Sequence, residues 1–193
     1  MPIDGPELAA DPLCVTRSRT LRLAALLLAV VAVGGTASAA HSAAQHETQL
    51  RSLNRQVAAA INAFRRTHNL APLHVSVGLK AAARQHSLEM GSDGYFDHPS
   101  ADGTPFWKRI QHHYPSTNYH YWTVGENLLW SSDSLSATDA LAMWIASPEH
   151  LANLKSKNWR KLGVSAVLVP DAGGVYGGST VTIITTDFGA RRR

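Results

Sequence analysis

Hydrophobic residues in the first half of the chain recur every three or four positions, the spacing of a helix with one buried face. This period predicts an amphipathic helix over about 47–68 and a second helix over about 76–91. A threonine followed by a proline predicts a short third helix over 104–113, because proline is favoured at the first helical position. The apolar stripe of the first helix consists of Leu50, Leu53, Val57, Ile61 and Phe64.

The segment 144–154 predicts that one helix ends and the next begins at once. Ser136 opens the first of these two helices with a pattern close to a capping box. Pro148 cannot continue that helix but suits the first position of a new one, with Ser147 as its N-cap. His150 then lies in the first turn of the second helix, where the positive helix end disfavours the imidazolium form.

Runs of β-prone residues predict strands in the last third of the chain. An extended run over 123–130 is followed, after the two helices, by strands at 163–169 and 181–188 with a glycine-rich loop between them. Helices that come first and antiparallel strands that come last favour an α+β domain built in layers. No linker or internal repeat divides the chain, so we expect a single domain.

Residues 1–39 have the order of a secretory signal peptide: basic residues, an apolar run over 23–33, and small residues up to Ala39. The run is well short of the roughly 20 apolar residues that a membrane-spanning helix needs. We therefore expect cleavage after Ala39, a flexible N-terminus over 40–46, and a secreted or periplasmic protein without a membrane span. The alternative is an uncleaved leader that anchors the protein in the membrane.

The net charge is mildly basic, +4, and is unchanged without the leader, which holds three arginines and three acids. The only basic run is Arg191–Arg193, which we interpret as a solvated tail over 190–193. Nucleic acid is therefore not an expected partner. The single cysteine, Cys14, lies in the leader, so the exported part of the chain has no thiol nucleophile, disulfide or cysteine metal ligand.

Histidine and carboxylate side chains are the remaining candidates for chemistry. The sequence has no His-Glu-x-x-His helix, no nucleophile elbow and no phosphate-binding glycine loop. Most of the ten histidines fall in tails, loops or helix ends, and His86 falls on an apolar helix stripe, where a hydrogen-bonded core histidine is expected. His98 and His150 differ, because a nearby proline constrains the backbone around each of them.

Four motifs, in this order, resemble those of the CAP superfamily, which groups cysteine-rich secretory proteins, antigen 5 and plant pathogenesis-related proteins. The resemblance covers about 47–189 and is to the short bacterial form of the family. It implies a three-layer α-β-α sandwich with a central antiparallel sheet and a large open cleft. The motifs are Phe96-Asp97-His98, Gly125-Glu126-Asn127, Trp144-x-x-Ser147-Pro148-x-His150-x-x-Asn153 and Leu162-Gly163-Val164.

The resemblance also implies a site, because two histidines and two glutamates line the cleft in many CAP proteins. By motif, the histidines correspond to His98 and His150, and one glutamate corresponds to Glu126. The position of the second glutamate is Ser147, which supplies no charge. The three remaining residues could hold Zn²⁺ or another divalent metal, with Glu126 as candidate general base. They could equally form a hydrogen-bonded pair that stabilises the cleft floor.

Further candidate binding residues lie next to these positions and in an aromatic, histidine-rich loop. Asn127 and Asn153 belong to the same motifs and are expected to line the cleft. Tyr119, Tyr121 and Trp122 are suited to stack on sugars or to bury lipid chains at a cleft rim. The alternative is that this loop packs on itself.

The sequence thus predicts a secreted, non-enzymatic binding module whose cleft binds an envelope lipid, a glycan or a divalent metal, with no cofactor required. The alternative is a metal-dependent, protease-like hydrolase that uses His98, His150 and Glu126. A third hypothesis gives the histidines a purely structural role in cleft packing.

Overall fold

A computed structural model describes residues 33–132 and 135–193 of the protein. Five helices and four strands follow one another in this part of the chain. They are α1 (Val33–Thr67), β1 (His74–Val75), α2 (Val77–Asp93), α3 (Phe106–His113), β2 (Tyr121–Ser131), α4 (Ala137–Ala146), α5 (Pro148–Lys155), β3 (Lys161–Ala172), the single 3₁₀ turn η1 (Gly174–Tyr176) and β4 (Ser179–Arg192).

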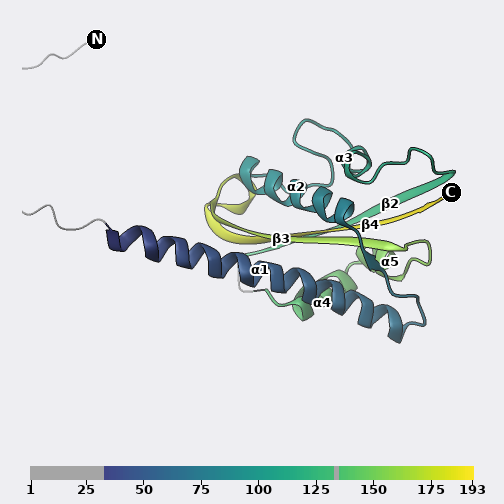
Figure 1. Ribbon diagram of the computed structural model, residues 1–193, viewed down its shortest axis with the longest axis horizontal. Coiled ribbons are helices and arrows are strands. Elements are labelled where there is room, and N and C mark those ends of the chain that lie inside the picture. Colours follow the sequence, from purple (N-terminus) through teal and green to yellow (C-terminus); the bar gives the residue numbers. More distant parts are fainter. Residues whose placement is uncertain (1–32, 133–134) are drawn as a thin grey trace, which may run out of the picture.

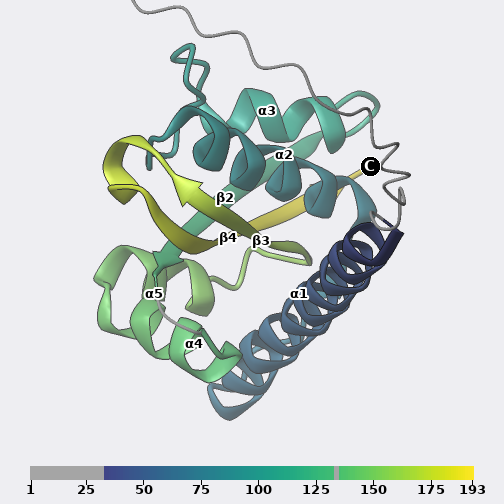
Figure 2. The ribbon, with the colours of Figure 1, turned by 90° about the vertical axis from the view of Figure 1, so that its left-hand side faces the viewer.

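These elements form the three-layer α-β-α sandwich that the sequence predicted. Helices α2 and α3 cover one face of the sheet, and α1, α4 and α5 cover the other face (Figures 1 and 2). The strand order is β1-β3-β4-β2, so β2 lies at one edge of the sheet. Residues at this edge lie next to both helical layers.

The sheet is mixed, which corrects the prediction of a purely antiparallel one. Strand β4 pairs antiparallel with both β2 and β3, and only β3 is joined to it by a hairpin-like connection. Strand β1 adds a short parallel pair to β3, in which His74 lies opposite Lys161. The sequence placed His74 in a loop, because two residues are too few to give an alternating pattern.

Helix α1 begins earlier than predicted, at Val33 instead of about residue 47. Residues 40–46, expected to be a flexible segment, therefore have helical backbone. The five alanines over 37–44 account for the difference, because alanine has the highest helix propensity. The apolar run and Cys14 of the predicted signal peptide fall almost wholly within residues 1–32, outside the described part of the chain.

The predicted helix boundaries in the middle of the chain are confirmed by their caps. The Ser136 side chain accepts from the Asp139 amide, and the Asp139 carboxylate accepts from the Ser136 amide, which completes a capping box. Pro148 occupies the first turn of α5. Ser147 precedes it in extended conformation but makes no side-chain cap, because its hydroxyl hydrogen-bonds to Glu149 at 3.3 Å.

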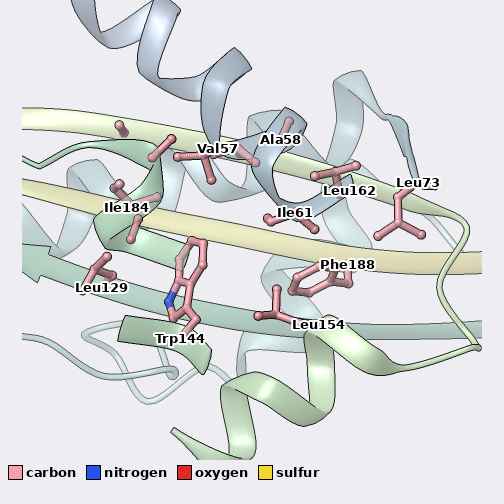
Figure 3. Packing of buried hydrophobic residues seen from close by; sticks show 14 of the residues in the cluster. Val57, Ala58, Ile61, Leu73, Leu129, Trp144, Leu154, Leu162, Ile184 and Phe188 are labelled. Carbon is pink, nitrogen blue, oxygen red and sulfur yellow. The ribbon is translucent and has the colours of Figure 1, made fainter. Parts of the chain in front are cut away.

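The largest hydrophobic cluster lies between the sheet and α1, α4 and α5. Figure 3 shows Trp144 on the α4 side of the cluster, with Ile184 and Phe188 of β4 on the sheet side. The Trp144 indole donates to the Leu128 carbonyl at 2.9 Å, so its polar atom is satisfied inside the core. The alternate residues of β4, such as Ile183, belong to a second cluster that includes Met90 of α2.

The C-terminus is part of the sheet, which corrects the prediction of a solvated tail over 190–193. Strand β4 continues to Arg192, where Tyr121 and Arg192 are register partners. The guanidinium groups of Arg191 and Arg192 lie against tyrosine rings. These cation–π contacts offset the repulsion between the neighbouring arginine side chains. Among the described residues, none of the helices combines the length and apolar character needed to cross a bilayer.

Candidate functional site

A fully buried histidine of α2 holds the loop that carries His98. Nε2 of His86 lies 2.9 Å from the carbonyl oxygen of Asp97, to which it donates. The Asp97 carboxylate in turn accepts from the His98 amide at 2.7 Å. His86 is therefore the hydrogen-bonded core histidine that the sequence predicted, and it positions the loop.

Glu126 lies at the centre of the site, buried in the middle of β2. Its Oε2 accepts a hydrogen bond from Nη2 of Arg109 at 2.6 Å, and its Oε1 accepts one from Nδ1 of His98 at 2.8 Å. Arg109, on α3, also donates to the His98 carbonyl and to the Ser100 hydroxyl at 3.3 and 3.1 Å. One guanidinium thus joins α3, the His98 loop and the edge strand.

These partners decide the ionisation of Glu126 and His98. Burial by itself would raise the pKa of Glu126, but the His98 hydrogen bond and the Arg109 charge outweigh it and lower the pKa. The hydrogen bond to Glu126 raises the pKa of His98 against the opposing effect of burial. The His98 side chain is 44% exposed, so its second ring nitrogen is accessible to a ligand.

A second carboxyl group lies on the same face of the sheet, next to Glu126. Asp187 of β4 is the register partner of Glu126, and its side chain is completely buried. Neither of its carboxyl oxygens has a hydrogen-bond partner among the described residues. Burial, together with the nearby Glu126 charge, raises the pKa of Asp187 well above its usual range. These surroundings favour the protonated form of Asp187 and the ionised form of Glu126.

Helix α5 is attached to the other face of β2 by two asparagines. Nδ2 of Asn127 donates to the His150 carbonyl at 3.1 Å. Nδ2 of Asn153 donates to the Glu126 carbonyl at 3.0 Å and to Oδ1 of Asn127 at 2.8 Å. A side chain at Gly125 would collide with Trp159 and Asn153, so glycine permits this close approach. The amides of Asn127 and Asn153 are thus engaged in holding α5.

His150 approaches the site from α5, round the edge of the sheet. Burial lowers its pKa, and the charge of protonated His98 lowers it further. The structure therefore brings His98 and His150 within electrostatic reach of each other, one favouring the protonated form and the other the neutral form. Ser147 lies at the start of the same helix, and its hydroxyl bonds Glu149 instead of any member of this site.

The predicted ligand set does not fit a catalytic zinc centre. Such a centre uses three protein ligands and keeps a further position for water. Each Glu126 oxygen already accepts a hydrogen bond, from Arg109 or from His98, so a metal at this carboxylate would compete with both donors. Across residues 33–132 and 135–193, no three histidine, cysteine or acidic side chains are arranged to hold a metal ion.

The aromatic residues of the predicted cleft rim lie at the start of β2, several residues away from Glu126. Trp122 donates its indole N–H to the Tyr114 carbonyl at 2.8 Å and packs in a small cluster with α2 and α3. Tyr119 and Tyr121 contact the arginines at the end of β4. The loop thus packs partly on itself, through Trp122 and Tyr114, and partly on the end of β4.

Sequence reasoning missed two residues of the site, Arg109 and Asp187. Asp187 carried a signal, because it is the one acid in the β-branched run 181–188, where an unpaired charge is costly. Arg109 gave no such signal. Lys108 precedes it on an amphipathic helix, so the sequence alone places both side chains in solvent. Its burial depends on where α3 docks.

Three comparisons with known proteins bear on this arrangement. The sequence model of the cysteine-rich secretory protein family, CAP, matches residues 58–184, more than half of the chain. The uncharacterised protein YkwD of Bacillus subtilis is 27% identical over 133 residues, which cover 68% of this chain. The alignment covers 49% of YkwD, so this chain spans about half the length of that relative.

Solved structures agree with the sequence match. An extracellular protein of Bacillus anthracis that contains an SCP domain is 25% identical, with a TM-score of 0.55 over 74% of this chain and 41% of that chain. An outer surface protein of Borrelia burgdorferi has a TM-score of 0.58 and 21% identity, over 70% of this chain and 90% of that chain. At 21% identity, the likeness to the Borrelia burgdorferi protein shows a shared fold alone.

Proposed function

This chain belongs to the cysteine-rich secretory protein (CAP) family, and from that premise we propose that it is a non-enzymatic extracellular binding module. The SCP-domain structure from Bacillus anthracis is that of an extracellular protein, which supports the proposed location. The leader over 1–39 directs the chain out of the cell and is removed after Ala39. Cleavage there falls inside α1 and leaves its packed part, from Leu53 onward, intact.

The proposal rests on one observation, the hydrogen bonding and the lowered pKa of Glu126. A general base needs a carboxylate oxygen within hydrogen-bond reach of the proton that it removes. Both oxygens of Glu126 accept hydrogen bonds from protein groups instead, and its lowered pKa makes it a weak base. The carboxylate orients His98, which is a positioning role.

The two histidines supply the binding groups. A His98 that donates Nδ1–H to Glu126 and is protonated on Nε2 offers a second donor to a ligand. His150, whose pKa is lowered, offers a neutral imidazole as acceptor. A donor next to an acceptor suits hydroxyl-bearing ligands, so we assign the cleft to a glycan or lipid headgroup of the cell envelope.

Co-sedimentation of the mature protein with two envelope fractions, delipidated wall glycan and vesicles of extracted lipid, tests this assignment. We expect the protein to sediment with one of the two fractions, and the His98→Ala and His150→Ala variants to lose most of that binding. His112→Ala, which removes an exposed histidine of α3, is the matched control and should bind normally. Equal binding by all four proteins would exclude the histidine cleft as the binding site.

A hydrolase assay separates the proposal from the enzymatic alternative. The mature protein is incubated with casein and with envelope material, with and without added Zn²⁺. We expect no turnover above that of the Glu126→Gln variant. Activity that needs Zn²⁺ and disappears in that variant would establish the hydrolase instead.

A further inference from the structure

A separate pocket of about 380 Å³ lies at the end of the sheet where β2 begins and β4 ends. Figure 1 shows the C-terminus beside the start of β2 at this end. Arg191 of the pocket is the register partner of Trp122, which lies about 14 Å along β2 from Glu126. The residues that line it are Ser76, Tyr114, Tyr119, Arg160, Lys161 and Arg191, and none of them is acidic.

Arg191 is held in place before any ligand arrives. Its guanidinium lies over the rings of Tyr114 and Tyr119, at 4.2 and 4.5 Å from their centroids. Its Nη1 donates to the Pro115 carbonyl at 3.0 Å. Because these contacts already restrict the side chain, a ligand that binds the guanidinium loses little further conformational entropy. Among the described residues, no acid forms an ion pair with it.

Two further cations and a helix end face the same pocket. Nη1 of Arg160 donates to the carbonyls of Lys157 and Trp159 at 2.7 and 2.9 Å, which fixes the guanidinium and leaves its other donors for a ligand. Lys161 is the next residue along β3. Ser76 is the N-cap of α2, a helix of 17 residues with no acid in its first turn, so the positive helix end adds to the field.

The positive charge continues on the other side of the Val75–Ser76 segment. A smaller pocket beside Val75, of about 200 Å³, has Arg55 and Lys80 in its lining and again no acid. The acids of α2 and of the loop that follows it, such as Glu89 and Asp93, lie at the far end of that helix. The charge on this part of the domain is therefore segregated, with cations gathered around the start of α2.

We propose that the pocket formed by Tyr119, Arg160, Lys161 and Arg191 binds a phosphate group carried on a sugar. A preorganised arginine fork matches a phosphate in bidentate fashion, and the lysine adds a point charge. Tyr114 is buried and only supports Arg191, whereas the partly exposed Tyr119 ring provides apolar surface for the sugar, as aromatic residues do in many small-molecule sites. The pocket volume lies in the lower part of the range of such sites, about 300–1,000 Å³. This site is independent of the histidine cleft.

Calorimetric titration of the mature protein with glucose 6-phosphate at low ionic strength tests the proposal. Inorganic phosphate and glucose are the comparison ligands. We expect glucose 6-phosphate to bind more tightly than phosphate and glucose not to bind. Arg191→Gln and Lys161→Gln should each weaken binding about tenfold or more, the effect of losing a hydrogen bond to a charged group. Arg84→Gln, which removes an exposed charge elsewhere on α2, should have no effect.

The tyrosine is tested separately from the charges. Tyr119→Ala should weaken binding, because it removes both the sugar platform and one ring that holds Arg191, whereas Tyr119→Phe should keep it. Circular dichroism and a melting curve establish that each variant is folded. The proposal would be overturned if phosphate and glucose 6-phosphate bound with equal affinity. It would also be overturned if Arg84→Gln and Lys161→Gln weakened glucose 6-phosphate binding equally. Tighter binding of a short oligonucleotide that depends equally on all these cations would also overturn it, in favour of a non-specific basic surface.

Discussion

Replacing Arg109 with methionine should destabilise the protein by about 4 kcal/mol at pH 7. Arg109 and Glu126 form an ion pair of 2.6 Å between side chains that are 1% and 0% exposed. Removal of one partner of a buried pair typically costs about 3–5 kcal/mol. Without Arg109, Glu126 can take up a proton, and this limits the electrostatic cost of the substitution. The limit is about 1.4 kcal/mol for each pH unit above the reference pKa of about 4.3, or roughly 3.7 kcal/mol at pH 7.

The pH dependence distinguishes this cause from a simple loss of packing. In the wild-type protein the pKa of Glu126 is lowered, so its stabilising contribution is present above the unfolded pKa and is lost as the pH falls. In Arg109→Met the buried carboxyl should have a raised pKa instead. The difference in free energy of unfolding between the two proteins should therefore shrink by about 1.4 kcal/mol per pH unit from pH 7 toward about pH 4.3.

Urea denaturation at several pH values measures this difference directly. The Arg109→Met/Glu126→Gln double variant should recover much of the loss at pH 7, because no charge is then left buried. Arg84→Met, an exposed arginine of α2, is the matched control and should change stability by less than about 0.5 kcal/mol. A loss of less than about 1 kcal/mol for Arg109→Met, or one that is constant from pH 7 to pH 5, would refute the reasoning.

Three other predictions concern stability. Asp187→Asn should stabilise the protein at neutral pH. Because the pKa of Asp187 is raised, its contribution to the free energy of unfolding is present below the unfolded pKa of about 3.9 and is lost as the pH rises toward the folded pKa. Urea titrations should therefore show that the variant gains at most about 1.4 kcal/mol in free energy of unfolding per pH unit above pH 4, and that this gain vanishes near pH 3. Trp144→Ala should cost about 3–5 kcal/mol in the same assay, against about 0 for exposed Trp107→Ala. EDTA should leave the melting temperature unchanged, and a rise of several degrees with Zn²⁺ that His98→Ala abolishes would contradict a metal-free fold.

Much of the fold could be predicted because its signals are local. A capping pattern at Ser136 and a proline at residue 148 act on the few residues around them, and both helix boundaries were predicted within a residue. The strands at 163–169 and 181–188 were recognised from β-branched residues, although β3 and β4 extend further at both ends. Strand ends were harder because pairing with β2 stabilises residues of β4, such as Arg191, that have no strand pattern of their own.

The candidate site could be predicted only where a motif existed. His98, Glu126 and His150 were found by resemblance, and the structure places them around one edge of the sheet. What Glu126 does there depends on Arg109, which is remote in sequence and gives no pattern. The two amides, Asn127 and Asn153, were expected to line the cleft, but a strand turns alternate residues to opposite faces, so Asn127 faces α5 while Glu126 faces α3.

By itself, the sequence determined most of the helices and strands and the layered class, because propensity, capping and hydrophobic period act between neighbouring residues. The family followed from the four motifs. Only the tertiary structure decided that Arg109, Glu126 and Asp187 share one buried face and that the terminal arginines lie on tyrosine rings. These contacts join residues 17 to 77 positions apart. They follow from the register of β2 on β4 and from the docking of α3. Both carboxyls are buried, so the partners that each one meets in that arrangement, and not residue type, lower the pKa of Glu126 and raise that of Asp187.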